Sequence, residues 1–155
     1  MLKKGLTVMY PIYGPGTVTD ISLEEVGDKS LNYCHIEFKN TNLSVAVPMD
    51  KFADFGIRTL SSKAAVKDAL KELDRQFRIK DSELEAIELE IDLKMKSGSL
   101  TDAAWVIAFL KSLSKKRAKE DKKLNSFQQD TLEKAENFLK LEVEMVLGKR
   151  AADKL

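Results

Sequence analysis

The chain has 155 residues, with 26 lysines and arginines against 25 aspartates and glutamates, a formal charge of +1 and a pI near 7.7. This length supports one domain or two small ones, and the charge balance does not by itself point to nucleic acid, membrane or an acidic partner. The single cysteine, Cys34, excludes an intrachain disulfide and a multi-cysteine zinc site and is typical of a reducing compartment. No apolar stretch reaches the ~20 residues of a membrane helix. We therefore expect a cytoplasmic protein with a mature N-terminus and no membrane partner.

Up to about residue 60 the composition is typical of β-strands. The segments LTVMY, GTVTDISL, LNYCHIEF and LSVAVP are rich in β-branched and aromatic residues. Turn signals separate them, at Gly14-Pro15-Gly16, at Gly27-Asp28 and at Lys39-Asn40-Thr41-Asn42. Four or five short strands at this spacing predict a small, strongly bent sheet or barrel. The Gly-Pro-Gly cluster is expected to reverse the chain between the first two strands.

From Ser61 onward the chain contains no proline and few glycines, so this half is expected to be helical. Apolar residues between Ala65 and Leu73 recur at three-to-four spacing and predict a first amphipathic helix. Ser82 lies three residues before Glu85, an arrangement typical of a capping box, and predicts the start of a second helix.

The segment from Glu88 to Met95 alternates polar and apolar residues and could also be read as a strand. Its richness in Glu, Leu, Lys and Met favours a helix, which Ser97-Gly98 would end. Two further helices are predicted to begin at the caps formed by Ser99 with Asp102 and by Asn125 with Gln128. An apolar stripe from Phe127 to Leu147 marks the last helix, and the terminal AADKL is expected to fray. Three or four helices would then pack as a bundle.

Few residues suggest catalysis. His35 is the only histidine, and because it adjoins Cys34 in a predicted strand the two side chains should point to opposite faces. We interpret His35 as a satisfied, partly buried residue, and Trp105 with Phe109 as core anchors. The chain lacks a Walker loop, a G-x-G-x-x-G turn and an H-E-x-x-H helix. The sequence therefore predicts no enzyme, no metal site and no cofactor.

Charge is unevenly distributed in the second half. An acidic run without a basic neighbour is either a solvated helix face or a surface for a basic partner: Glu83, Glu85, Glu88, Glu90 and Asp92. A later basic run is a candidate DNA-binding surface, because its cations can neutralise phosphates. Its members are Lys111, Lys115, Lys116, Arg117, Lys119, Lys122 and Lys123. Cations also favour helix C-termini, so this run has a purely structural alternative.

Three segments contain recognisable motifs: VMYPIYGPGTVTDI has a V-x-Y-P…G-x-G entry, NLSVAVPMDKFADFGIRTL has a V-x-V-P strand followed by G-h-R (h, apolar), and KMKSGSLTDAAWVIAFLKSL has an S-G helix break. With these motifs, the chain resembles, in order and across nearly its whole length, the CarD-like bacterial transcription regulators. The N-terminal part is similar to the RNA-polymerase-interacting module of transcription-repair coupling factors. The resemblance implies an α+β protein: a Tudor-like five-stranded β-barrel in residues 1–60 that docks on the RNA polymerase β subunit, then a helical bundle in residues 61–155 that faces promoter DNA and helps to stabilise the open complex.

In this family, docking involves strand pairing with the polymerase. The matching residues here are Asn42, Leu43, Ser44, Val45, Ala46, Val47 and Pro48. As an exposed edge, they could extend a partner's sheet. The protein is expected to act as a monomer, associated with the nucleoid through RNA polymerase.

The sequence departs from the family pattern where DNA contact is expected. The family's tryptophan has its counterpart near Leu84, and Glu85 and Ala86 follow where the family has arginines. The start of the last helix, often basic in the family, reads Gln128-Gln129-Asp130. Positions that are basic at the polymerase-facing surface of some relatives are occupied by Glu24 and Ala46. Two functions stay open: a polymerase-bound regulator with weak, non-specific contact to duplex promoter DNA, or a polymerase-associated adaptor whose acidic helix recruits a basic partner.

Overall fold

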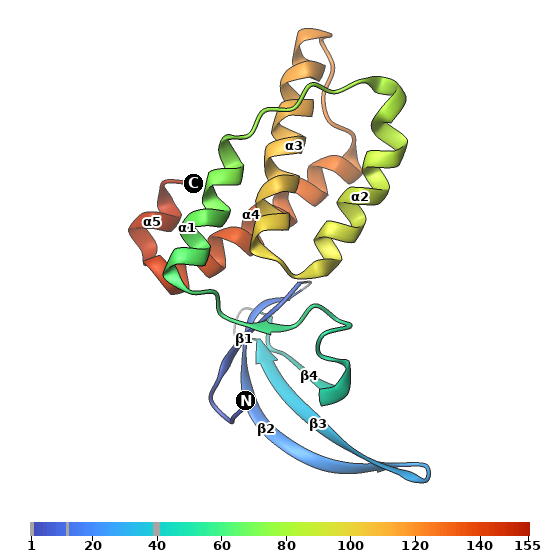
Figure 1. Cartoon of the computed structure of the whole chain (residues 1–155), viewed down its shortest axis with the longest axis vertical. Helices are drawn as coiled ribbons and strands as arrows, with labels where there is room; N and C mark the ends of the chain where they lie inside the picture. Colours follow the sequence, from blue (N-terminus) through green and yellow to red (C-terminus); the bar gives the residue numbers. More distant parts are fainter. Residues whose placement is uncertain (1, 12, 39–40) are drawn as a thin grey trace. The chain divides into compact units, whose positions relative to one another are not determined.

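The structure, a computed structural model, describes residues 2–11, 13–38 and 41–155. The chain is divided into two compact units, Met1–Leu60 and Ser61–Leu155. The first contains a β-sheet and the second contains helices, as Figure 1 shows, so the α+β fold class is confirmed.

The described residues of the N-terminal unit form five strands: β1 (Thr7–Tyr10), β2 (Gly14–Val26), β3 (Lys29–Phe38), β4 (Leu43–Pro48) and β5 (Arg58–Thr59). They form one antiparallel sheet in the order β4-β3-β2-β1-β5, and a 3-10 turn, Met49–Lys51, follows β4. Within the part of the chain that the structure describes, β4 pairs only with β3 and β5 only with β1. The sheet is therefore open at both ends, and the expected closed barrel is not confirmed.

Alternation along the strands places one face of the sheet on a core. The fully or almost fully buried members of this core are Val8, Val18, Cys34, Ile36, Phe38, Val47 and Ile57. Cys34 is buried whereas its neighbour His35 lies half-buried on the opposite face, as the strand pattern predicts. Burial raises the pKa of the Cys34 thiol, so a smaller fraction of it is in the reactive thiolate form.

The Gly-Pro-Gly cluster does not form the first turn. Tyr10 already pairs with Gly14, so the chain has reversed before Pro15 and Gly16, which are part of β2. Gly14 has a φ of +77°, which suits the end of this turn. Gly16 has another role: an added Cβ would lie 2.5 Å from Ile36 Cγ2 and 2.7 Å from Phe38 Cε1. The glycine is required because β2 passes directly over these two core side chains.

The two later turn signals have different outcomes. Gly27-Asp28 forms the two-residue loop between β2 and β3, with Gly27 at a φ of +63°, as predicted. For the predicted turn between β3 and β4, Lys39 and Asn40 lie outside the described residues.

Five α-helices make up the second unit: α1 (Lys63–Lys71), α2 (Leu84–Ser97), α3 (Leu100–Lys119), α4 (Ser126–Leu147) and α5 (Lys149–Asp153). Figure 1 shows α3 in the middle of this unit, with α1 on one side of it, α2 on the other and α4 crossing behind. Two 3-10 turns, Glu72–Asp74 and Asp81–Glu83, flank the extended segment between α1 and α2. α3 is the central helix because it is apolar over most of its circumference from Ala103 to Leu113.

The predicted helix boundaries are partly confirmed. Ser99 accepts a hydrogen bond from the Asp102 N–H, Asn125 and Gln128 form a complete capping box, and Gly98 ends α2 in the left-handed conformation. The Ser82 capping box is wrong. Residues 81–83 form a 3-10 turn that leads directly into α2, so Ser82 lies inside a turn rather than before a helix.

Packing at the end of the chain also corrects two expectations. Residues 151–153 of the terminal AADKL do not fray but belong to α5, in which Ala152 is buried, whereas Lys154 and Leu155 lie beyond this helix and are exposed. Phe127 does not join the buried stripe of α4, because 57% of it is exposed.

Within the buried stripe of α4, Glu142 is fully buried, and its Oε2 accepts a hydrogen bond from the Ser61 N–H at 3.0 Å. This carboxylate fixes the first residue of the helical unit to α4.

Candidate functional site

The β4 edge has the burial pattern of a strand with one free side. Val47 is buried and Leu43 and Val45 are partly buried against the core, whereas Ser44 and Ala46 are exposed. Asn42, just before the strand, is exposed and has a φ of +51°. Side chains that point away from the core are therefore small, which leaves the backbone of β4 accessible to another strand.

The hydrogen-bond direction in β3 follows from the β2–β3 hairpin. Its loop has only two residues, 27–28, so Val26 and Lys29 form a pair that exchanges both backbone hydrogen bonds. Alternation from Lys29 then directs the backbone groups of odd-numbered β3 residues toward β2 and those of even-numbered residues toward β4. Thr19 Oγ1 donates to the His35 carbonyl oxygen at 3.3 Å, which agrees with this assignment.

The same alternation continues into β4. Val45 and Val47 lie opposite even-numbered β3 residues, so their N–H and C=O groups bond to β3. Ser44 and Ala46 lie in the intervening pairs, and their N–H and C=O groups point to the outer edge. Pro48 belongs to the same outward set but has no N–H to donate. The outer edge thus offers two outward N–H donors, those of Ser44 and Ala46, and ends at Pro48.

A polar cluster on the sheet face opposite the core borders this edge. Ala46 pairs with His35, whose Nε2 lies 2.9 Å from Ser22 Oγ and 3.5 Å from Glu24 Oε1. His35 therefore has polar partners, as interpreted from the sequence. Its position beside Ala46 was not part of the sequence-based site, although strand alternation alone could have indicated it.

The basic run lies on the second half of α3 and the loop that follows. Lys111 Nζ lies 3.8 Å from Glu136 Oε1 of α4, and Lys116 Nζ lies 2.8 Å from Asp81 Oδ1. Five of the seven candidates form no ion pair within the described structure: Lys115, Arg117, Lys119, Lys122 and Lys123. All are exposed except Arg117, which is half-buried. Asp121 then ends the helix at a φ of +58°, and the Lys122 N–H donates to the Arg117 carbonyl oxygen at 2.7 Å.

Electrostatics join this helix end to the segment between α1 and α2. The hydrogen bond from Lys116, assisted by the charges of Lys116, Arg117 and Lys122, lowers the pKa of Asp81. The segment preceding Asp81 runs along α3, because the Phe77 N–H donates to Ser112 Oγ at 3.3 Å. It contributes three exposed cations that the sequence-based site omitted: Arg75, Arg78 and Lys80. Only tertiary packing brings them beside the basic run, so no local signal could have identified them.

An aromatic cluster lies at the middle of α3. Trp105 stacks on Phe109 with ring centroids 5.4 Å apart, and Phe77 packs edge-on against both rings. Phe109 is buried and Trp105 is half-buried, with Lys94 Nζ 4.8 Å from its ring centroid. The cluster anchors α2 and the 75–80 segment to α3, in agreement with the interpretation of Trp105 as a core residue.

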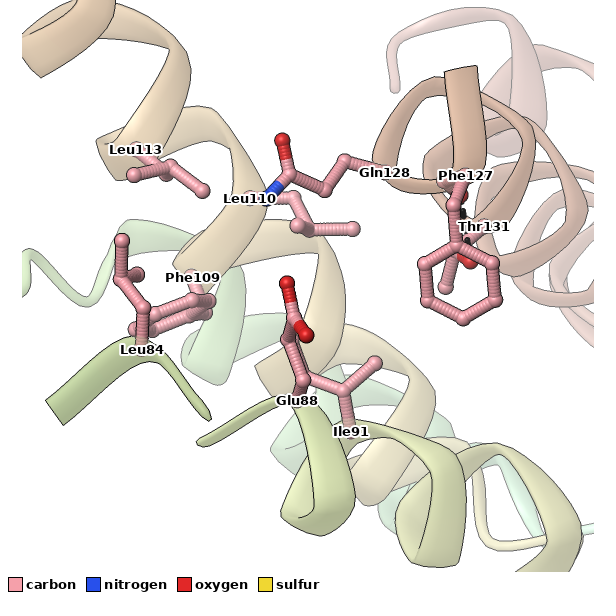
Figure 2. A pocket seen from close by; sticks show the side chains of 9 residues that line it. All are labelled: Leu84, Glu88, Ile91, Phe109, Leu110, Leu113, Phe127, Gln128 and Thr131. Carbon is pink, nitrogen blue, oxygen red and sulfur yellow. Dashed lines mark hydrogen bonds between the residues drawn. The ribbon is translucent and has the colours of Figure 1, made fainter. Parts of the chain in front are cut away.

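A small pocket lies within the helical unit. Figure 2 shows Glu88 and Ile91 of α2 facing Phe127, Gln128 and Thr131 of α4, with Leu110 of α3 between them. Two of its polar side chains have local partners: Gln128 Oε1 accepts from the Asn125 N–H, and Thr131 Oγ1 donates to the Phe127 carbonyl oxygen. Glu88 is the carboxylate among the lining residues, and six of the others are apolar, so the pocket has the character of a packing gap. In residues 2–11, 13–38 and 41–155 no three His, Cys, Asp or Glu side chains are grouped to hold a metal ion. In the same ranges, none of the helices is both long and apolar enough to span a bilayer.

The open sheet edge and the charged helix surfaces are features of a binding module. Residues 2–61 match the family model of the CarD-like/TRCF RID domain. The N-terminal unit is therefore similar to this domain family, and the resemblance to CarD-like regulators is confirmed.

The chain is also similar to one curated protein and to one solved structure. Over 153 residues the chain is 27% identical to the "Putative transcription factor YdeB" of Bacillus subtilis (strain 168). The match covers 96% of this chain and 94% of that protein. The chain is also 29% identical to the 72-residue N-terminal domain of Myxococcus xanthus CarD, solved by NMR in solution, over 38% of this chain and 79% of that domain, with a TM-score of 0.34.

Proposed function

We propose that this protein is a transcription regulator that binds the β subunit of RNA polymerase through the β4 edge and stabilises promoter open complexes. Similarity along nearly the whole chain to a protein named "Putative transcription factor YdeB" supports the regulatory role. The RNA-polymerase-interacting domain family supports the polymerase as partner. The observation that carries the choice of surface is the open edge of β4 within that domain.

Docking would extend the sheet by one strand from the polymerase. The outward N–H groups of Ser44 and Ala46 would donate to that strand, and their carbonyl oxygens would accept from it. Their small side chains let the second backbone approach, and Pro48 ends the ladder. Because the main chain supplies these bonds, Ala46 can replace a basic residue without loss of the pairing itself.

The helical unit would contact promoter DNA weakly and without sequence preference. Its support is the set of five cations at the end of α3 that have no ion pair in the described structure. Leu84 is half-buried at the start of α2, in contact with the pocket of Figure 2, and so does not form an exposed wedge. Phosphate contacts without base contacts give affinity but no sequence specificity.

The salt dependence of DNA affinity tests this contact. Three phosphate contacts would give a slope of log affinity against log salt of roughly −3. Replacing Lys115, Lys119 and Lys123 with alanine should flatten the slope by up to ~3 units, because each lost contact removes ~0.9. Fluorescence anisotropy with a labelled duplex at several salt concentrations provides the measurement.

The matched control removes three exposed lysines from α1 instead, by changing Lys63, Lys67 and Lys71 to alanine. Both triple variants have the same net charge. If both variants show equal slopes of log affinity against log salt, the change in slope results from the lower total charge, and the end of α3 is not the DNA interface.

Co-purification tests the proposed function as a whole. Tagged protein expressed at its native level should retain core RNA polymerase through washes at moderate salt, because backbone pairing is screened less than surface ion pairs. Purified protein added to a promoter complex should then lengthen the lifetime of the open complex after a heparin challenge. Recovery without polymerase, or an unchanged lifetime despite binding, would contradict the corresponding half of the proposal.

A further inference from the structure

We propose that the outward face of α2 binds a basic amphipathic helix of a partner protein. The face consists of a leucine ridge, defined as Ala86, Leu89 and Leu93, with acidic residues beside it. Leu89 is 65% exposed and Leu93 is 62% exposed, although both lie inside a regular helix. These leucines are one turn apart, so they form a continuous apolar ridge rather than scattered exposed residues.

The opposite face of α2 already accounts for packing within the unit. Ile91 is buried, and Leu84, Ile87 and Met95 are partly buried. Leu89 and Leu93 lie on the other side of the helical wheel and make no contribution to this core. The helix therefore has two apolar faces, of which only one is covered.

Charge determines which partner fits. Glu85 and Glu90 flank the ridge on either side and Glu83 adds to the negative field, whereas Glu88 lies on the side of α2 that faces α4. None of these four carboxylates has an ion pair in the portion of the chain described. Glu85 and Glu88 are three residues apart, a like-charge spacing that weakens an isolated helix. This cost is recovered when a cationic partner binds.

The basic residues of α2 do not neutralise this surface. Lys94 Nζ lies 3.4 Å from Asp102 Oδ1 and over the Trp105 ring, and Lys96 Nζ lies 2.9 Å from Asp92 Oδ2. The ridge thus presents an apolar stripe with a net negative border. Duplex DNA and a second copy of the same face would both be repelled. A helix with an apolar stripe bordered by lysines or arginines is complementary in both respects.

The test uses the full chain and two synthetic helical peptides with the same leucine stripe. One peptide has lysines beside the stripe and the other has glutamates at the same positions. Fluorescence anisotropy should show tighter binding of the lysine peptide, and salt should weaken it. Combining Leu89→Ser with Leu93→Ser should weaken binding roughly tenfold or more, because both central apolar contacts are lost.

Two further variants separate the ridge from general acidity. The control Leu23→Ser with Val26→Ser removes two exposed apolar side chains from the β2–β3 hairpin and should bind like the wild type. Glu85→Lys with Glu90→Lys should reverse the preference toward the glutamate peptide. Equal affinity for both peptides, or an equal loss in both serine double variants, would overturn the proposal. A dimer that dissociates in Leu89→Ser with Leu93→Ser would assign the ridge to a second copy and would overturn it as well.

Discussion

Replacing Gly16 with valine should unfold the N-terminal unit at temperatures where the wild-type unit is folded. The first added carbon already lies 2.5 Å from Ile36 Cγ2 and 2.7 Å from Phe38 Cε1, and both side chains are fully or almost fully buried. Overpacking of this kind costs about 1–3 kcal/mol for one inserted group, and valine inserts three carbons. Alanine should cost less, because it inserts one carbon instead of three and reduced freedom of the unfolded chain offsets about 0.4–1 kcal/mol of that cost.

Thermal unfolding monitored by circular dichroism of the full chain gives the measurement, with Ser30→Val as control. Ser30 is exposed in β3, where a β-branched residue suits a strand. The order of stability should be wild type and Ser30→Val, then Gly16→Ala, then Gly16→Val. If Gly16→Val were as stable as the wild type, the close approach of β2 to Phe38 would be wrong.

Proline at Ser44 should weaken binding to the polymerase β subunit by about tenfold or more while the protein stays folded. The substitution removes an outward donor and prevents close pairing at the centre of the edge. Proline at Val45, the next residue, should destabilise the sheet instead, because the Val45 N–H bonds to β3. The neighbouring positions therefore distinguish docking from folding.

Binding to the isolated β-subunit lobe and thermal unfolding should be measured on the same samples. Ser44→Ala keeps the backbone donor and should bind like the wild type. If folded Ser44→Pro binds the lobe with unchanged affinity, or if Ser44→Ala loses as much affinity as Ser44→Pro, strand pairing through β4 is not the mode of docking.

Local sequence patterns predicted much of the N-terminal unit because strand alternation and short turns depend on near neighbours. The Gly27-Asp28 hairpin and the opposite burial of Cys34 and His35 illustrate this. The use of Gly16 could not be predicted, because its necessity comes from Phe38, far along the chain. Whether the sheet closes likewise depends on long-range pairing between β4 and β5, which no local pattern specifies.

The helical unit shows the same limit. Complete caps at Ser99 and Asn125 were predictable, since each involves residues within one turn. The nearly alternating apolar residues of α2 gave no basis for choosing which face would be covered, and packing on α3 decides that only Ile91 is buried. A linear count of the basic run also could not show that Lys116 is paired with Asp81, 35 residues earlier.

Residue-resolved hydrogen exchange at β4 tests the central claim, docking through this edge, most directly. In the free protein the outward amides of Ser44 and Ala46 should exchange faster than the amides of Val45 and Val47, which bond to β3. Adding the β-subunit lobe should slow exchange at Ser44 and Ala46 strongly and leave Val45 and Val47 little changed. Unaltered exchange at Ser44 and Ala46 in a lobe complex that is demonstrably formed would contradict docking through β4.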